Sequence, residues 1–222
     1  MSATVKLTIF ALMVSLIATG PQLFSQENPW ILKRLHPDMK VYYRESPNSN
    51  IQELKITFDV QASLNTIMAV LNDVPVYPDW AFKCIKARVV ENISDTEMYY
   101  YNEIDFPWPM SNRDLVAHSF VKQDPITKKI STHSVSAHYR EPENADIVRV
   151  KLIDIRWEIM PTGPNSAYIE YFLMSDPGGT IPTWMINLAI DKGPTTSMRG
   201  FMERLKLDKY KNTQLAYIQN LE

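Results

Sequence analysis

A succession of six alternating segments between Cys84 and Asp176 constrains the fold of this chain more than any other feature. Apolar and polar residues alternate within each segment, which is typical of a half-buried β-strand. Short connections containing Asp, Asn, Gly and Pro separate the segments, and such connections join neighbouring antiparallel strands. The predicted strands lie near residues 84–93, 97–105, 114–123, 129–139, 147–160 and 166–175.

Helical patterns flank this strand-rich region. Residues 51–60 predict a further strand, and Ser63 is placed to cap a short helix whose apolar residues follow at spacings of three and four. After the turn at residues 176–179, apolar side chains return at helical spacing as far as Leu205. Pro194 lacks a backbone donor and should kink this helix at Gly193–Pro194.

A long meander and one amphipathic helix can bury both of their apolar faces only if the sheet wraps around the helix. The sequence therefore predicts an α+β fold in which a curved antiparallel sheet surrounds a long C-terminal helix.

The composition limits the class of protein. With 222 residues and 45% hydrophobic residues, the chain can form one well-packed domain, so intrinsic disorder is excluded. Its single cysteine, Cys84, excludes a disulfide scaffold, and no apolar run reaches the ~20 residues of a membrane span. A net charge of −2 argues against nucleic acid as a partner.

The first residues are typical of a secretory signal peptide. Lys6 precedes an apolar stretch at residues 7–18, and small residues follow. We expect residues 1–25 to be removed after Ser25, leaving residues 26–222 as a single exported domain in the periplasm or outside the cell. An uncleaved membrane anchor is the alternative.

Three segments of the mature chain resemble the StAR-related lipid-transfer (START) domain family, and especially its phosphatidylcholine-transfer-like branch. The segments are Pro107–Asp114, Ile147–Lys151 and Asp176–Asn187. Their order and spacing fit the family over about residues 28–207. The resemblance implies a helix-grip fold that encloses a hydrophobic tunnel covered by the C-terminal helix. It also implies binding and transfer of a lipid or sterol-like ligand without catalysis.

The resemblance also places polar groups in the tunnel. Glu103 occupies the position of an inward-facing carboxylate in the family. Sterol-binding members pair this carboxylate with an arginine where this chain has Ser119, and phosphatidylcholine-type members hold phosphate with an arginine where this chain has Tyr77. Arg149 and His133 are alternative partners for Glu103, and a solvated Glu103 is the third possibility. Arg113 is expected to pair locally with Asp114.

Alternation along the strands and the helix, together with this resemblance, predicts the ligand-binding residues. Trp157 is the residue that we expect most to contact ligand, and ordinary core packing is the alternative for each apolar member. The predicted set is Cys84, Tyr101, Glu103, Ser119, Ser131, His133, Arg149, Trp157, Ile159, Tyr171, Ile186, Ile190, Ser197 and Phe201.

Two other function classes stay open. Related helix-grip folds include cyclases and hydrolases, for which Glu103 and His133 would be the acid–base candidates. An envelope interaction module with a sealed core and no ligand is the second alternative. The histidines lack a metal-binding spacing and the chain lacks nucleotide-binding motifs, so no metal or cofactor is expected. The basic stretch at residues 199–211 is either a site of transient membrane contact or a solvated face.

Overall fold

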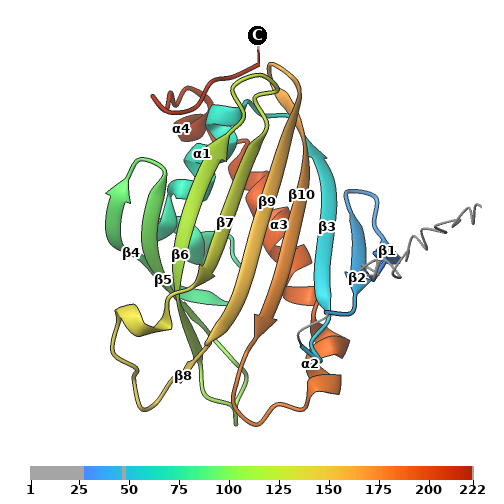
Figure 1. Cartoon of the computed structure of the whole chain (residues 1–222), viewed down its shortest axis with the longest axis vertical. Coiled ribbons are helices and arrows are strands. Elements are labelled where there is room, and N and C mark those ends of the chain that lie inside the picture. The colour runs from blue at the N-terminus through green and yellow to red at the C-terminus, as the bar shows by residue number, and fades with distance from the viewer. Residues whose placement is uncertain (1–27, 47–48, 222) are drawn as a thin grey trace, which may run out of the picture.

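The structure, a computed structural model, describes residues 28–46 and 49–221. Ten strands form one curved sheet in the order β1-β2-β3-β10-β9-β7-β6-β5-β4, and β8 pairs with β6 (Figure 1). The strands are β1 Ile31–Leu35, β2 Lys40–Arg44, β3 Glu53–Val60, β4 Cys84–Ser94, β5 Glu97–Ile104, β6 Arg113–Gln123, β7 Ile130–Ser136, β8 Val148–Arg149, β9 Leu152–Gly163 and β10 Ser166–Asp176.

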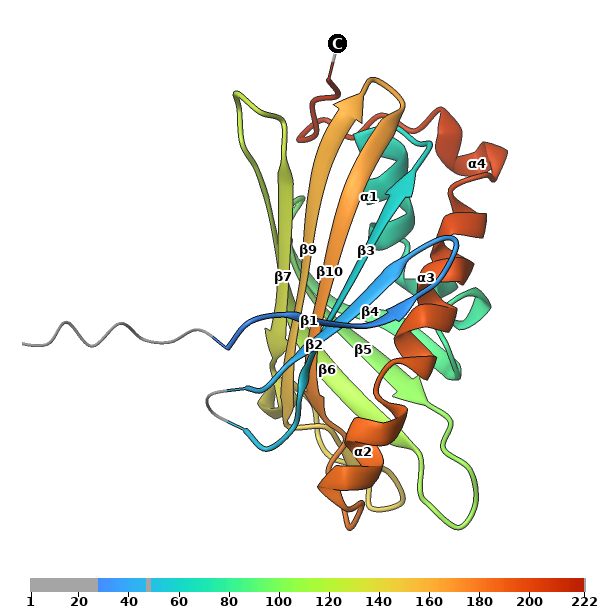
Figure 2. The ribbon, with the colours of Figure 1, turned by 90° about the vertical axis from the view of Figure 1, so that its right-hand side faces the viewer.

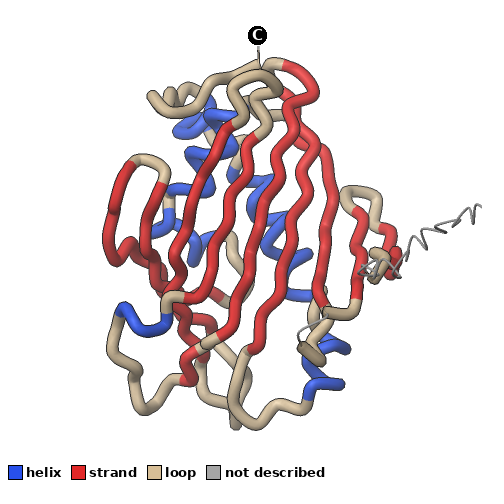
Figure 3. The backbone as a smooth tube through the Cα atoms, in the orientation of Figure 1, coloured by secondary structure: helices blue, strands red, loops and turns tan. Residues whose placement is uncertain are grey.

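The α-helices cover one face of this sheet. Figure 2 shows α1 and α3 on the same side, with the two ends of the sheet curving towards them, and Figure 3 shows the strands as a continuous layer in front of the helices. The predicted α+β fold, a curved antiparallel sheet wrapped around a C-terminal helix, is therefore confirmed. The helical segments are α1 Leu64–Asn72, the 3₁₀ turns Val74–Asp79 and His138–Arg140, α2 Thr183–Ala189, α3 Lys192–Arg204 and α4 Asp208–Lys211.

Two helix signals in the sequence have clear structural counterparts. The Ser63 hydroxyl accepts a hydrogen bond from the Thr66 backbone nitrogen at 3.2 Å, as expected of a residue that caps α1. The C-terminal helix is interrupted at Ile190 and Asp191, one turn before Pro194, rather than at the predicted Gly193–Pro194. Pro194 lies in the first turn of α3, where its missing donor is tolerated, whereas a helix continuing through Ile190 would bring its ring against the Ile190 carbonyl.

Two parts of the sheet differ from the sequence prediction. Residues 147–160 do not form one strand, because β8 pairs in parallel with Arg113–Asp114 and β9 begins only at Leu152. The hairpin of β1 and β2 was not predicted. Every residue of β1 is exposed, so β1 lacks the alternation that would have signalled it, and its pairing depends on β2.

The strand register determines which side chains share the concave face. Residues directly opposite one another on antiparallel strands project to the same side of a sheet. Trp157 lies between Tyr171 and Thr132, and Thr132 lies opposite Val121. The next row on the same face lies two residues further along each strand and contains Ile155, Ser134, Ser119 and Met98.

The expected signal peptide, residues 1–25, lies outside the described residues and stays a prediction. Within residues 28–46 and 49–221, no helix combines the length and apolar character needed to cross a membrane.

Candidate functional site

Aromatic side chains attach α3 to the concave face of the sheet. The ring centroids of Trp157 and Phe201 are 5.1 Å apart, and those of Trp157 and Tyr171 are 4.9 Å apart. Phe201 also contacts Trp80 and Phe58, at centroid distances of 5.8 and 6.4 Å. Phe201 has no solvent exposure, so α3 and the sheet share one continuous core here.

A group of small hydroxyl side chains interrupts this apolar face on β6 and β7. Ser119 and Ser134 are buried opposite one another, and the Ser134 hydroxyl donates to Ser119 Oγ at 2.9 Å. Thr132 is buried in the next row of the same face. Valine or isoleucine at these positions would fill more of the space beneath α1 and the 3₁₀ turn Val74–Asp79, so the small side chains leave a hollow.

That hollow has a volume of about 40 Å³. Ligand pockets for drug-sized molecules are ~300–1,000 Å³, so this conformation holds no lipid-sized tunnel at this position. The expected tunnel is absent here because Trp157 packs directly on Phe201. The lining residues are Met68, Leu71, Asn72, Tyr77, Met98, Tyr100, Ser119, Val121, Thr132, Ser134, Ile155 and Trp157.

The tyrosines near the hollow are held in their neutral form. Burial raises the pKa of the Tyr77, Tyr100 and Tyr171 hydroxyls, because desolvation penalises the phenolate. For Tyr100, a hydrogen bond with Ser134 acts against this rise in pKa. The Tyr77 hydroxyl donates to the Leu71 carbonyl at 2.6 Å. The polar groups at this site therefore carry no charge.

Five predicted residues lie within the concave core or beside it. Ser119 and Trp157 line the hollow, and Tyr171 packs against Trp157. Ile159 is fully buried in the same cluster, and Cys84 is buried opposite Ile104. Ser119 and Tyr77, the two positions at which the family resemblance predicts arginines, border the same hollow.

The helical members of the predicted set differ in their surroundings. Phe201 is core, and Ile190 packs against the core at the break between α2 and α3. Ser197 accepts a hydrogen bond from the Phe82 backbone nitrogen at 2.9 Å, so it fastens α3 to the loop before β4. Ile186 is half-buried on α2.

Tyr101 and Glu103 do not have the expected inward orientation. Their neighbour Tyr100 packs with Tyr77 on the concave side, at a centroid distance of 6.1 Å, so Tyr101 and Glu103 project to the opposite face of β5. Glu103 accepts a hydrogen bond from Asn112 Nδ2 at 3.0 Å, and the Tyr101 hydroxyl lies 3.5 Å from its other oxygen. Neither Arg149 nor His133 is the partner of Glu103.

Arg149 instead forms a buried ion pair with Asp114. Its guanidinium donates to both carboxylate oxygens, at 2.6 and 3.0 Å, and to the backbone carbonyls of His138, Glu141 and Pro142. The prediction that Arg113 pairs with Asp114 is therefore wrong, because Asp114 pairs with Arg149. Arg113 donates to the Ser111 and Pro177 carbonyls and so joins the loop before β6 to the turn after β10.

Ser131 and His133 also lie on the outer face, because the register places Thr132 rather than its neighbours opposite Trp157. The Ser131 hydroxyl donates to Glu158, and His133 Nε2 lies 3.2 Å from an Asp154 carboxylate oxygen with nearly half its side chain exposed. Glu103 lies opposite Asp114 and His133 opposite Phe120, six residues apart on β6. At ~3.4 Å per residue this separates them by about 20 Å, too far for a shared acid–base site.

Sequence reasoning missed Thr132, Ser134, Tyr100 and Met98. Thr132 and Ser134 alternate with the two β7 residues that were predicted, so a shift of one residue exchanges the two sets. The signal that identifies them is their register against Trp157 and Ser119, which requires knowledge of the strand pairing.

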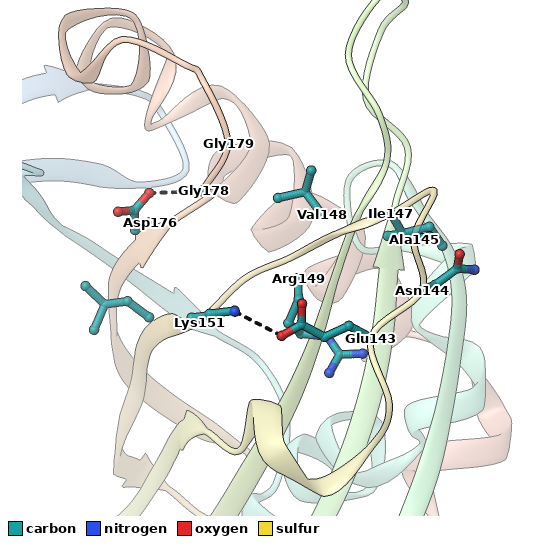
Figure 4. Close-up of a pocket in the computed structure, with 11 residues that line it drawn as sticks. Glu143, Asn144, Ala145, Ile147, Val148, Arg149, Lys151, Asp176, Gly178 and Gly179 are labelled. Carbon is teal, nitrogen blue, oxygen red and sulfur yellow. Dashed lines mark hydrogen bonds and ion pairs between the residues drawn. The ribbon is translucent and has the colours of Figure 1, made fainter.

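A larger, open groove of about 540 Å³ lies at the end of the molecule that contains β8 (Figure 4). The loop at residues 143–152 and the turn at Asp176–Gly179 form its walls. Lys151 pairs with Glu143 at 3.0 Å, and Asp176 accepts a hydrogen bond from the Gly178 backbone nitrogen at 2.9 Å. Its openness to solvent and its charged side chains distinguish this groove from the interior hollow.

The basic stretch at residues 199–211 is neutralised locally. Each of its five cations has a carboxylate within ion-pair distance: Arg199 pairs with Asp38, Arg204 with Asp79, Lys206 with Glu203, Lys209 with Asp73, and Lys211 with Asp208. This pairing favours the solvated-face interpretation of the stretch. Among the described residues, no group of three or more His, Cys, Asp or Glu side chains could hold a metal ion.

Comparisons with known proteins agree with this architecture. Residues 22–211 match the START domain family. An uncharacterized protein of Pseudomonas aeruginosa, PA1579, is 26% identical over 176 residues, which cover 77% of this chain and 84% of the relative. Mouse phosphatidylcholine transfer protein is 31% identical over 110 residues, about half of each protein. A STAR-related lipid transfer protein fragment from Xanthomonas axonopodis shares the fold, with a TM-score of 0.74 and 24% identity over 80% of this chain and 99% of the fragment.

Proposed function

Because this chain belongs to the START domain family, we propose that it binds a lipid or a similar hydrophobic ligand between α3 and the concave face of the sheet. It carries this ligand between membranes without changing it covalently. The names of the mouse and Xanthomonas relatives, which describe lipid transfer, support this proposal.

The observation that carries the proposal is the contact of Trp157 with Phe201 beside a hollow that three small hydroxyl side chains of β6 and β7 border. Separation of these two rings would join the hollow to the space under α3 and expose a continuous apolar surface. Burial of a sixteen-carbon chain there is worth ~13 kcal/mol before binding costs, at ~0.8 kcal/mol per methylene. Apolar burial alone can therefore supply useful affinity.

Movement of α2 and α3 supplies the opening in this proposal. The helix interruption at Ile190–Asp191 and the turn at Gly178–Gly179 are the two hinge positions. Both glycines have positive φ, 66° and 74°, a backbone conformation that favours glycine. The Ser197 bond to the Phe82 nitrogen and the Phe201 contacts hold the closed state.

Membrane contact occurs at the end of the molecule that contains α2 and the loop between β5 and β6 (Figure 2). Trp108 in that loop is 92% exposed, and Trp184 on α2 is 65% exposed. Tryptophan favours the membrane interface, where its apolar ring and polar N–H group are both accommodated. The open groove between β8 and the 176–179 turn lies at the same end (Figure 1).

Export also belongs to the proposal. The basic start and apolar stretch within residues 1–18 support a secretory signal peptide. N-terminal sequencing of the protein from its own host tests this directly. A first residue at position 26 is expected, and an intact N-terminus would contradict cleavage.

Vesicle-to-vesicle transfer of fluorescent lipids tests the function. The protein should accelerate transfer of at least one member of a panel containing a diacylglycerol, a phosphatidylcholine and a sterol. The Trp108→Ser, Trp184→Ser double variant should transfer more slowly while retaining the ligand that copurifies with it. Ile126→Ser is the matched control, because Ile126 is 86% exposed in the β6–β7 hairpin at the opposite end of the molecule. No acceleration of any lipid by the wild type would contradict the proposed function.

A further inference from the structure

The buried charges of the described chain lie away from the hollow beneath α1 and the 3₁₀ turn Val74–Asp79. Asp114 is paired with Arg149, Glu53 with Arg44 and Asp191 with Arg34, while Arg113 donates to backbone carbonyls. None of these residues lines the hollow. A charged group of a ligand would therefore find no counter-charge there.

The polar side chains that do line the hollow carry hydroxyls, apart from the neutral amide of Asn72. The Ser119 oxygen accepts from Ser134, so the Ser119 hydroxyl hydrogen can be donated to another group. Thr132 supplies a second buried hydroxyl one row away. Asn102 adds a neutral acceptor further along β5, since its buried Oδ1 has no hydrogen-bond partner within the described residues.

We propose that this hydroxyl-lined hollow receives the uncharged, hydrogen-bonding end of a neutral lipid, such as the hydroxyl and ester groups of a diacylglycerol. This inference rests on the proposed function and specifies its ligand class. Hydroxyls both donate and accept, so they match alcohol, ester and ketone groups. Burial of a phosphate or carboxylate without a paired cation is strongly unfavourable, so anionic lipids are excluded from this position.

Two probes with identical acyl chains test the selectivity. The full chain is incubated with vesicles containing equal amounts of dioleoylglycerol and dioleoylphosphatidic acid, recovered, and its bound lipid measured by mass spectrometry. We expect at least a tenfold excess of dioleoylglycerol. Equal or preferential retention of dioleoylphosphatidic acid would overturn the inference and leave the proposed function standing. Retention of neither lipid, with no copurifying lipid, would overturn both.

Variants locate the selectivity in the hollow. The Ser119→Ala, Ser134→Ala double variant should retain less dioleoylglycerol, by roughly 2- to 12-fold for each hydrogen bond lost. Ser131→Ala is the matched control, since Ser131 lies on the same strand as Ser134 but faces outwards, and its retention should equal that of the wild type. Equal losses in both variants would contradict the assignment.

A reversal experiment adds a counter-charge. Ser119→Arg places a cation at the hollow and should shift retention towards dioleoylphosphatidic acid. An unchanged preference in the folded variant would count against the inference. Should this variant fail to fold, the alanine variants and the wild-type preference still decide the question.

Discussion

Arg149 and Asp114 lie beneath the loop that follows β7, where their side chains are 1% and 2% exposed. The guanidinium joins β6, β8 and three carbonyls of the loop at residues 138–142. The hydrogen bond that Arg149 donates to Asp114 is the main reason that the Arg149 pKa is raised. Arg149 therefore fixes the loop that leads into the wall of the open groove, which begins at Glu143.

Replacement of Arg149 should be strongly destabilising. Arg149→Ala leaves the Asp114 carboxylate buried without its counter-charge, which typically costs ~3–5 kcal/mol. Urea denaturation measures the free energy of unfolding. Lys151→Ala removes an exposed ion pair two residues away and should leave that free energy close to the wild-type value. A similar small effect of both changes would contradict the structural role of Arg149.

Cys84 should be an inert thiol. Burial is the main cause that raises its pKa from 9.0 to about 11. At pH 8 the thiolate fraction is then about 100-fold smaller in the folded chain than in the unfolded chain. Iodoacetamide alkylation, followed by mass spectrometry, should be slower by at least that factor in buffer than in denaturing urea. Equal rates would contradict the burial of this thiol.

The same pKa difference gives a pH dependence of stability. The unfolded thiol ionises near pH 9, whereas the folded thiol keeps its proton to about pH 11. Between these two pH values, loss of the thiol proton stabilises only the unfolded state. Cys84 should therefore lower the free energy of unfolding as the pH rises from about 9 to about 11. Cys84→Ser should lessen this decline in a series of urea titrations.

The orientation of single side chains was the hardest feature to predict. Tyr100 and Tyr101 are adjacent and both buried, so alternation in β5 does not identify the concave face. In β7, Ser131 and Ser134 are equally small and polar, and only the pairing with β9 separates them. A shift of one residue reverses every side chain of a strand, and sequence alone contains no reference for that choice.

The secondary-structure elements were predicted more successfully than the orientations. Strands β4 to β7 and β10 closely follow the alternating segments. The predicted strand at residues 147–160 is divided because Val148 and Arg149 pair with β6 before the chain turns into β9. Strand β1 escaped prediction because no face of it is buried.

Fixing α3 to the loop before β4 should slow ligand exchange. A disulfide between Phe82→Cys and Ser197→Cys, in a Cys84→Ser background, covalently replaces the 2.9 Å bond between Ser197 Oγ and the Phe82 nitrogen. Because the proposed opening separates α3 from the sheet, the oxidised form should exchange a fluorescent diacylglycerol at least tenfold more slowly than the reduced form. Unchanged exchange after oxidation would contradict gating by α3.

For the whole molecule, the family resemblance and the fold follow from sequence, whereas the state of the interior does not. Three segments identified the START domain, and the match over residues 22–211 confirms it. The volume of the interior depends on how closely Trp157 approaches Phe201, a contact between residues 44 positions apart. No local pattern reports such a distance, so an open tunnel was expected where a hollow of about 40 Å³ is found.

The presence of a bound lipid tests the account most directly. Native mass spectrometry of the protein purified from its own host, with analysis of its organic extract, measures the mass and identity of any bound ligand. We expect one copurifying hydrophobic molecule per chain, chemically unchanged and neutral. A protein whose mass equals that of the polypeptide alone, with an empty extract and no uptake of lipid from vesicles, would contradict it.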